Sequence, residues 1–239
     1  MQKIKLIALD LDGTALDEKS RLTERTKRVL EQAAEAGIYL IAASGRAYSS
    51  LPEDVMALKG LTYAITSNGA ATYDPKKGER SFSCPMEEEK VEELLELLRE
   101  EPETAIEVFW QGHPLASRAF LENPVSYGAP KRVIPYLQRT RTPVNDIYAF
   151  IWEHKKELDA LDIICQGPLN KVEWFDKIYA LGGFYMTSST HYRLELSALK
   201  SGKGAALREA PARLGVCPDE IIAFGNADND IDMLRFAGI

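Results

Sequence analysis

Two aspartates, Asp10 and Asp12, stand two positions apart directly after the short apolar run of residues 6–9. Successive side chains of a strand alternate between its faces, so a strand continuing through this pair would send both carboxylates to the same side. Gly13 then lets the backbone turn sharply away. Two like charges this close repel each other unless a cation lies between them or one carboxyl is protonated. The pair therefore predicts a catalytic carboxylate site that suits Mg²⁺, or else two aspartates that cap a loop.

Polar residues also follow three other apolar runs, and the four runs together predict a sheet. Continuous apolar runs of this length are typical of strands buried on both faces of a parallel sheet. The four runs are residues 6–9, 39–43, 63–66 and 221–224. Ligands of open α/β sheets bind outside the carboxyl ends of the strands. Since every run ends in polar residues, we expect carboxylates, amides, a hydroxyl and glycines to meet at one edge.

A helix is predicted between the first two runs, over Thr23–Ala36, and strand, helix and strand then form a right-handed βαβ unit. Residues 71–74 and 80–83 flank Pro75-Lys76-Lys77-Gly78 and predict a hairpin. The fold class is therefore α/β, with a Rossmann-like parallel sheet as its core.

The middle of the chain predicts an α+β insert within this core. Helical spacing covers residues 87–100 and 171–181, and strands are predicted at 147–152, 161–165 and 184–188. We expect the core to resume at Tyr192–Leu196. The predicted organisation is a catalytic core of residues 1–83 and 191–239, interrupted by a cap domain of residues 84–190.

The composition narrows the classes of function. The chain has 239 residues, 29 basic and 36 acidic, and a net charge of −7. Proteins that bind nucleic acid usually carry the opposite sign, so we expect no nucleic-acid partner. No apolar run approaches the roughly 20 residues that span a bilayer, and the N-terminal apolar stretch is too short for a signal peptide. Three cysteines without a CxxC pair favour reduced thiols in a cytoplasmic protein.

Four motifs in order resemble those of the haloacid dehalogenase superfamily of phosphohydrolases. The first is Asp10-Leu11-Asp12-Gly13-Thr14, and the second is Ser44-Gly45-Arg46. Lys203 resembles the lysine of the third motif, and Gly225-Asn226-Ala227-Asp228-Asn229-Asp230 resembles the fourth. The insert between the second and third motifs is similar to the type-two cap of the Cof-like subfamily, as is Asn68-Gly69. Any one motif could arise by chance, but four in this order hardly could.

The resemblance implies a mechanism and a set of site residues. Asp10 would attack the phosphoryl group and form an aspartyl-phosphate, and Asp12 would act as general acid and then as general base. Lys203 would neutralise charge, in preference to Lys200, because glycines flank it. Phosphate-binding groups would come from Thr14, Ser44, Gly45, Arg46, Asn68 and Asn229, with Arg46 equally open to a structural role. Mg²⁺ would be held by Asp10, Asp12, Asn226 and Asp230. The substrate would be a small phosphorylated metabolite, such as a sugar phosphate.

Two departures from the family pattern stand out. Asn226 occupies the place of an acid, which removes one negative charge and predicts weaker metal affinity. The chain also ends at Ile239, where family members usually continue, so we expect either a truncated form whose sheet lacks an edge strand or a sheet closed in another way. Two alternatives to the phosphatase stay open. One is a phosphomutase of the phosphomannomutase type, and the other is a weakened phosphate- or metal-binding regulatory protein.

Overall fold

The computed structural model describes residues 3–239, and the first two residues of the predicted core lie outside them. The chain forms two compact units, Met1–Ser83 with Ser201–Ile239, and Cys84–Lys200. The sheet of the first unit has the order β12-β1-β2-β3-β4-β5. Strands β12, β1, β2 and β3 are parallel, whereas β4 and β5 form an antiparallel hairpin. Their bounds are β1 Leu6–Asp10, β2 Tyr39–Ala43, β3 Leu61–Thr66, β4 Ala71–Asp74, β5 Glu79–Ser83 and β12 Ile221–Phe224.

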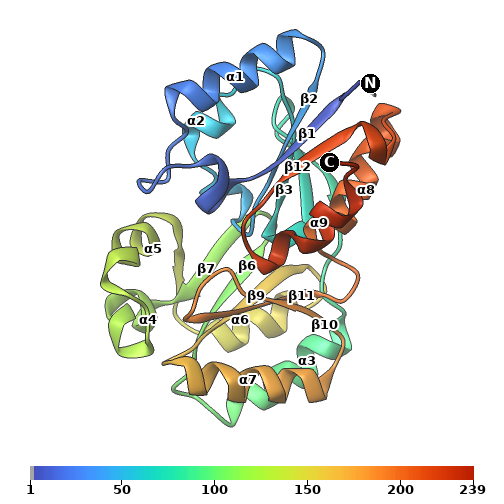
Figure 1. Cartoon of the computed structure of the whole chain (residues 1–239). Helices are drawn as coiled ribbons and strands as arrows, with labels where there is room; N and C mark the ends of the chain where they lie inside the picture. Colours follow the sequence, from blue (N-terminus) through green and yellow to red (C-terminus); the bar gives the residue numbers. More distant parts are fainter. Residues whose placement is uncertain (1–2) are drawn as a thin grey trace. The chain divides into compact units, whose positions relative to one another are not determined.

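Helices cover both faces of this sheet, which explains why its four parallel strands are largely apolar (Figure 1). Leu6 and Ala8 of β1 pack with residues of α8 (Lys203–Leu214) and α9 (Ile231–Phe236), and Leu40 and Ala42 of β2 pack with residues of α1 (Glu24–Glu35) and α2 (Glu53–Met56). Helix α1 begins after Thr23, whose hydroxyl accepts a hydrogen bond from the Thr26 amide. The predicted α/β fold and its βαβ unit are confirmed.

The second unit is an α+β domain with a mixed sheet of order β10-β11-β9-β6-β7-β8. Its strands are β6 Ala105–Trp110, β7 His113–Ser117, β8 Thr142–Val144, β9 Leu158–Ile164, β10 Phe184–Thr187 and β11 Arg193–Ala198. One face packs against α3 (Glu88–Arg99), α6 (Ile147–His154) and α7 (Pro168–Leu181). The short helices α4 (Arg118–Glu122) and α5 (Ile134–Thr140) contribute to a smaller apolar cluster.

Two sequence predictions in this unit are wrong. Residues 147–152 form helix α6 and not a strand, because the Asp146 carboxylate accepts a hydrogen bond from the Ala149 amide and caps the helix. Strand β11 does not belong to the core sheet. It pairs antiparallel with β9 and β10, so the second unit extends to Lys200 instead of residue 190.

The end of the described chain lies against the edge strand β12. The amide of Ala223 donates to the carbonyl of Ile239, and the amide of Ile239 donates to the carbonyl of Ile221. Gly238 adds a hydrogen bond from its amide to the carbonyl of Pro218. These bonds pair part of the edge at β12, where the sequence left open whether the sheet lacks a strand or is closed in another way. Within residues 3–239, no helix is both long and apolar enough to cross a membrane, and Cys84, Cys165 and Cys217 are free thiols.

A row of buried charged side chains crosses the second sheet. The strand register places Asp162 of β9 directly opposite Glu107 of β6 on one side and Glu195 of β11 on the other. Arg141 binds Glu107 through two hydrogen bonds of 2.9 and 3.0 Å, and Arg193 binds both Glu107 and Asp162. Burial works to raise the pKa of Glu107, but the two guanidinium groups outweigh it and lower that pKa. Burial and the Glu195 charge instead raise the pKa of Asp162 well above its ordinary value.

We therefore expect Asp162→Asn to stabilise the protein at neutral pH, by on the order of 1 kcal/mol. An acid whose pKa is raised by folding stabilises the fold below its unfolded pKa, and this contribution is lost as the pH rises through its folded pKa. The advantage of the variant should thus be small near pH 4 and larger at pH 8 in urea titrations. Glu107→Gln is the matched control. It should destabilise the protein, since it replaces a carboxylate that forms ion pairs with two arginines by a neutral amide. Equal effects of both variants would contradict this account.

Candidate active site

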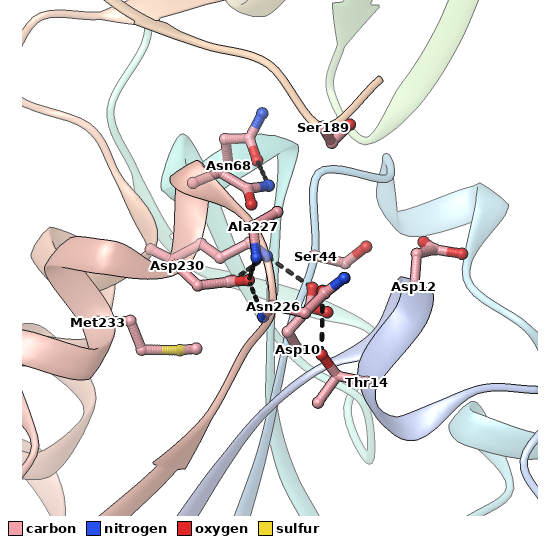
Figure 2. Close-up of polar contacts among 12 residues, drawn as sticks. Asp10, Asp12, Thr14, Ser44, Asn68, Ser189, Asn226, Ala227, Asp230 and Met233 are labelled. Carbon is pink, nitrogen blue, oxygen red and sulfur yellow. Dashed lines mark hydrogen bonds and ion pairs between the residues drawn. The ribbon is translucent and has the colours of Figure 1, made fainter. Parts of the chain in front are cut away.

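Asp10 is the last residue of β1, and the chain leaves the strand there in a tight turn over Leu11–Ala15, in which the Leu16 amide donates to the Leu11 carbonyl. Gly13 has φ +84°, a conformation that favours glycine, and a Cβ atom at this position would lie 2.6 Å from Asn226 Nδ2. Because the strand ends at Asp10, the alternation of side chains does not extend to Asp12. Strand alternation therefore does not place the Asp12 side chain, and Figure 2 shows the Asp12 carboxylate set apart from that of Asp10.

Lys203, the first residue of α8, is a fully buried cation that joins two carboxylates. Its Nζ donates to Asp10 Oδ1 at 2.7 Å and to Asp230 Oδ1 at 2.6 Å. Burial raises the pKa of the Asp10 carboxyl above its ordinary value, and the charge of Lys203 acts against that rise by favouring the ionised form. Of the two lysines that the sequence offered, Lys203 is the one that binds the Asp10 carboxylate.

Asp230 orients this lysine and also the loop that follows β12. Its Oδ2 accepts hydrogen bonds from the amides of Asn226 and Ala227 at 2.9 and 3.1 Å (Figure 2). Both of its carboxylate oxygens are thus engaged by protein donors. The structure consequently gives Asp230 the role of a positioning residue for Lys203, whereas the metal-binding role that the sequence suggested for it stays a prediction.

Arg46 binds the Asp12 carboxylate through two hydrogen bonds. Its Nε donates to Asp12 Oδ2 at 2.7 Å, and its Nη2 donates to Oδ1 at 2.5 Å. The same guanidinium donates to the Ser50 carbonyl and to the Ser20 hydroxyl, a partner that the sequence analysis missed. Of the two roles that the sequence left open for Arg46, this geometry favours the structural one. The Asp12 side chain remains 49% exposed and therefore accessible to solvent.

Polar groups from the turns after β2 and β3 lie beside these carboxylates in the same unit. Ser44 is buried, and its Oγ accepts a hydrogen bond from the Arg46 amide. Asn68 has φ +51°, and its Oδ1 accepts from Asn229 Nδ2 at 3.0 Å. A Cβ atom on Gly45 would lie 3.0 Å from Asn68 Oδ1, so the two turns approach closely. The structure thus brings Asn68 and Asn229 together from turns that are far apart in the sequence.

The side chain of Asn226 meets three oxygens. The atom at the inner end of its amide lies 3.1 Å from Thr14 Oγ1, 3.2 Å from Asp10 Oδ2 and 3.2 Å from the main-chain oxygen of Asp12. With Oδ1 at this end, Thr14 donates to it, as drawn in Figure 2. No sequence pattern pointed to the Asp12 carbonyl, because any residue at this position carries one.

The oxygen atoms near Asn226 are the candidate ligands of a Mg²⁺ ion. Within residues 3–239, no three His, Cys, Asp or Glu side chains are arranged to hold a metal ion. The carboxylates of Asp12 and Asp230 are engaged by Arg46 and Lys203. The Asp10 carboxylate and the Asp12 carbonyl nevertheless each place an oxygen 3.2 Å from the inner end of the Asn226 amide, which would supply a third oxygen when its Oδ1 points inward. Mg²⁺ prefers such hard oxygen ligands and keeps several waters, so the donor set fits this ion with one charged ligand.

The sheet order, the inserted α+β unit and this set of residues define an α/β protein with a carboxylate site at the carboxyl ends of its parallel strands. Comparison with known proteins gives the family: haloacid dehalogenase-like hydrolases match residues 7–239, and the chain belongs to that family. The chain is thus an enzyme of the hydrolase class, as the resemblance implied.

The relatives cover nearly the whole chain. Phosphatase YwpJ of Bacillus subtilis is 28% identical over 98% of this chain and 87% of its own. The 5-amino-6-(5-phospho-D-ribitylamino)uracil phosphatase YcsE of the same organism is 25% identical over 99% of this chain and 82% of its own. A solved haloacid dehalogenase-like hydrolase from B. subtilis has a TM-score of 0.82 at 25% identity and covers 98% of this chain and 87% of its own.

Proposed function

We propose that the protein is a phosphatase that hydrolyses the phosphomonoester of a small metabolite, with Asp10 as the nucleophile. The observation that carries the proposal is the environment of Asp10. Its Oδ1 accepts a hydrogen bond from the buried Lys203, whereas its Oδ2 lies 3.2 Å from the inner end of the Asn226 amide, which also lies close to Thr14 Oγ1 and the Asp12 carbonyl oxygen. A carboxylate held in this way at the carboxyl end of a parallel strand is preorganised for attack on phosphorus.

The proposed reaction has two steps. A carboxylate oxygen of Asp10 attacks phosphorus, and the bond from phosphorus to the ester oxygen breaks as Asp12 gives that oxygen a proton and an alcohol leaves. Water then attacks the aspartyl-phosphate, passes a proton to Asp12, and releases inorganic phosphate and free Asp10. Asp12 is suited to the proton transfers because its carboxylate is half exposed, and it must leave Arg46 to reach the ester.

Charge neutralisation supports both steps, since phosphoryl transfer depends mainly on positioning and electrostatics. Lys203 supplies a fixed positive charge at Asp10. Ser44, Asn68 and Asn229 offer hydrogen-bonding groups for the phosphate, and Thr14 offers a hydroxyl. Mg²⁺, held by Asp10, the Asp12 carbonyl and Asn226, would neutralise charge on the phosphate oxygens and on Asp10.

We further propose that the substrate is a sugar phosphate or a similar phosphomonoester. The name of the YcsE relative, which specifies a phosphorylated ribityl compound, supports this class. The net charge of −7 supports a small molecule as the partner and not a nucleic acid. Three free thiols agree with the expected cytoplasmic location.

The test is hydrolysis of a chromogenic phosphate ester with and without Mg²⁺, followed by a panel of sugar phosphates and other phosphomonoesters. We expect release of inorganic phosphate that increases with Mg²⁺. Transfer of the phosphoryl group within a sugar, with a requirement for a bisphosphate activator, would identify a phosphomutase instead. A stable phosphorylated protein without turnover would identify the regulatory alternative.

A further inference from the structure

Asn226 faces a set of atoms that only one orientation of its amide satisfies without a cation. The Asp12 carbonyl oxygen is a hydrogen-bond acceptor and never a donor. The same holds for Asp10 Oδ2 when the Asp10 carboxyl is ionised. With Asn226 Oδ1 at the inner end, three oxygens that carry lone pairs face one another, and only the Thr14 hydroxyl donates. With the amide turned over, Nδ2 lies at 3.1–3.2 Å from Thr14 Oγ1, the Asp12 carbonyl and Asp10 Oδ2, and its two N–H groups can donate to the Asp12 carbonyl and to Asp10 Oδ2.

The surroundings of Asn226 allow this rotation without a larger movement. The two ends of the amide exchange places when it turns about the bond between Cβ and Cγ. At its outer end, Asn226 Nδ2 occupies space that a Cβ atom on residue 13 would enter, and glycine leaves that space free. The Thr14 hydroxyl can donate to an oxygen or accept from a nitrogen, so it fits either orientation. Asn226 is exposed, so a cation can reach it from solvent.

We infer that the Asn226 amide is a two-state element that responds to a divalent cation. Without the cation, Nδ2 points inward and its N–H groups hold Asp10 Oδ2 and the Asp12 carbonyl. With the cation, Oδ1 points inward and becomes its third protein ligand. A cation must therefore displace hydrogen bonds that already satisfy the site. The inference rests on the proposed function only for the identity of the cation as Mg²⁺.

An aspartate at position 226 could not act in this way. A carboxylate has no N–H group, and in the absence of a cation it would add a second negative charge beside Asp10 Oδ2. The amide thus keeps the cation-free site intact while lowering the affinity for the cation. The result is a site that is occupied only when the free cation is abundant.

The first test compares the wild-type protein with Asn226→Asp by calorimetry with Mg²⁺ and by thermal melting. We expect the variant to melt at a lower temperature without Mg²⁺, to bind Mg²⁺ roughly tenfold more tightly or better, and to gain more thermal stability from the ion. Asn145→Asp, an exposed position in the second unit, matches the change in net charge and should leave Mg²⁺ binding unchanged. Equal melting and equal Mg²⁺ affinity of wild type and Asn226→Asp would overturn the inference.

The second test observes the amide itself. The ¹⁵N–¹H signals of the Asn226 side chain, assigned by their loss in Asn226→Asp, should show slow exchange with water in the metal-free protein. Mg²⁺ should shift them and speed their exchange, whereas KCl at the same ionic strength should not. Signals that do not respond while Mg²⁺ binds would overturn the inference. A responding amide in a protein without hydrolytic activity would support the inference and refute the proposed phosphatase function.

Discussion

Asp10→Asn should lower the rate of phosphate-ester hydrolysis by roughly 10³-fold or more, which is the scale of loss expected when a nucleophile is removed. Asparagine keeps the shape of Asp10 but lacks the charge that attacks phosphorus. It also weakens the bond with Lys203, so folding has to be followed alongside the rate. Steady-state assays with circular dichroism and thermal melting separate the two effects.

The matched control for this variant is Asp176→Asn, an exposed aspartate on α7 of the second unit. It removes the same charge and should retain wild-type activity. If Asp10→Asn is folded and still hydrolyses the ester at more than a few per cent of the wild-type rate, Asp10 is not the nucleophile.

Lys203→Met should both destabilise the protein, by about 3–5 kcal/mol, and abolish hydrolysis. Lys203 is fully buried and donates to Asp10 and Asp230. Methionine fills a similar volume but leaves two buried carboxylates without their cation. Urea titration of the folded protein measures the loss of stability, and the ester assay measures the loss of activity.

Two further variants separate the structural part of this effect from the catalytic part. Lys200→Met removes an exposed lysine and should change neither property. The double variant Lys203→Met/Asp230→Asn removes one of the two uncompensated charges and should recover part of the stability, but none of the activity. Full stability in the single variant would show that the two carboxylates do not depend on Lys203.

The sequence was sufficient to predict which residues meet at the site in the first unit. Asp10, Ser44, Asn68 and Asn226 follow strands of one sheet, and the carboxyl ends of parallel strands share one edge. The apolar runs that define those strands are continuous because helices bury both faces of the sheet. In this part of the molecule, the predicted strands and the positions of the polar residues therefore indicate the same site.

Side-chain directions within the site could not be predicted in the same way. The backbone leaves the strand at Asp10, so strand alternation does not place Asp12, whose carboxylate binds Arg46. The Asp12 carbonyl has no signature in the sequence, and the orientation of the Asn226 amide depends on atoms from two distant loops.

In the second unit, local patterns were outweighed by capping and by pairing over long distances. Residues 147–152 are rich in aromatic and β-branched side chains, but the cap at Asp146 and the buried Ile147 and Ile151 place them in a helix. Strand β11 follows β10 along the chain as an antiparallel neighbour, and its apolar residues gave no sign of which sheet it joins.

The most direct measurement of the central claim is mass spectrometry of the protein during turnover. The reaction with a phosphate ester is quenched in acid, which preserves an aspartyl-phosphate, and the protein is digested. Our account predicts a peptide that contains Asp10 and is heavier by one phosphoryl group, found in the wild type and absent from Asp10→Asn. Rapid hydrolysis with no such peptide, or with the phosphoryl group on another residue, would contradict the account.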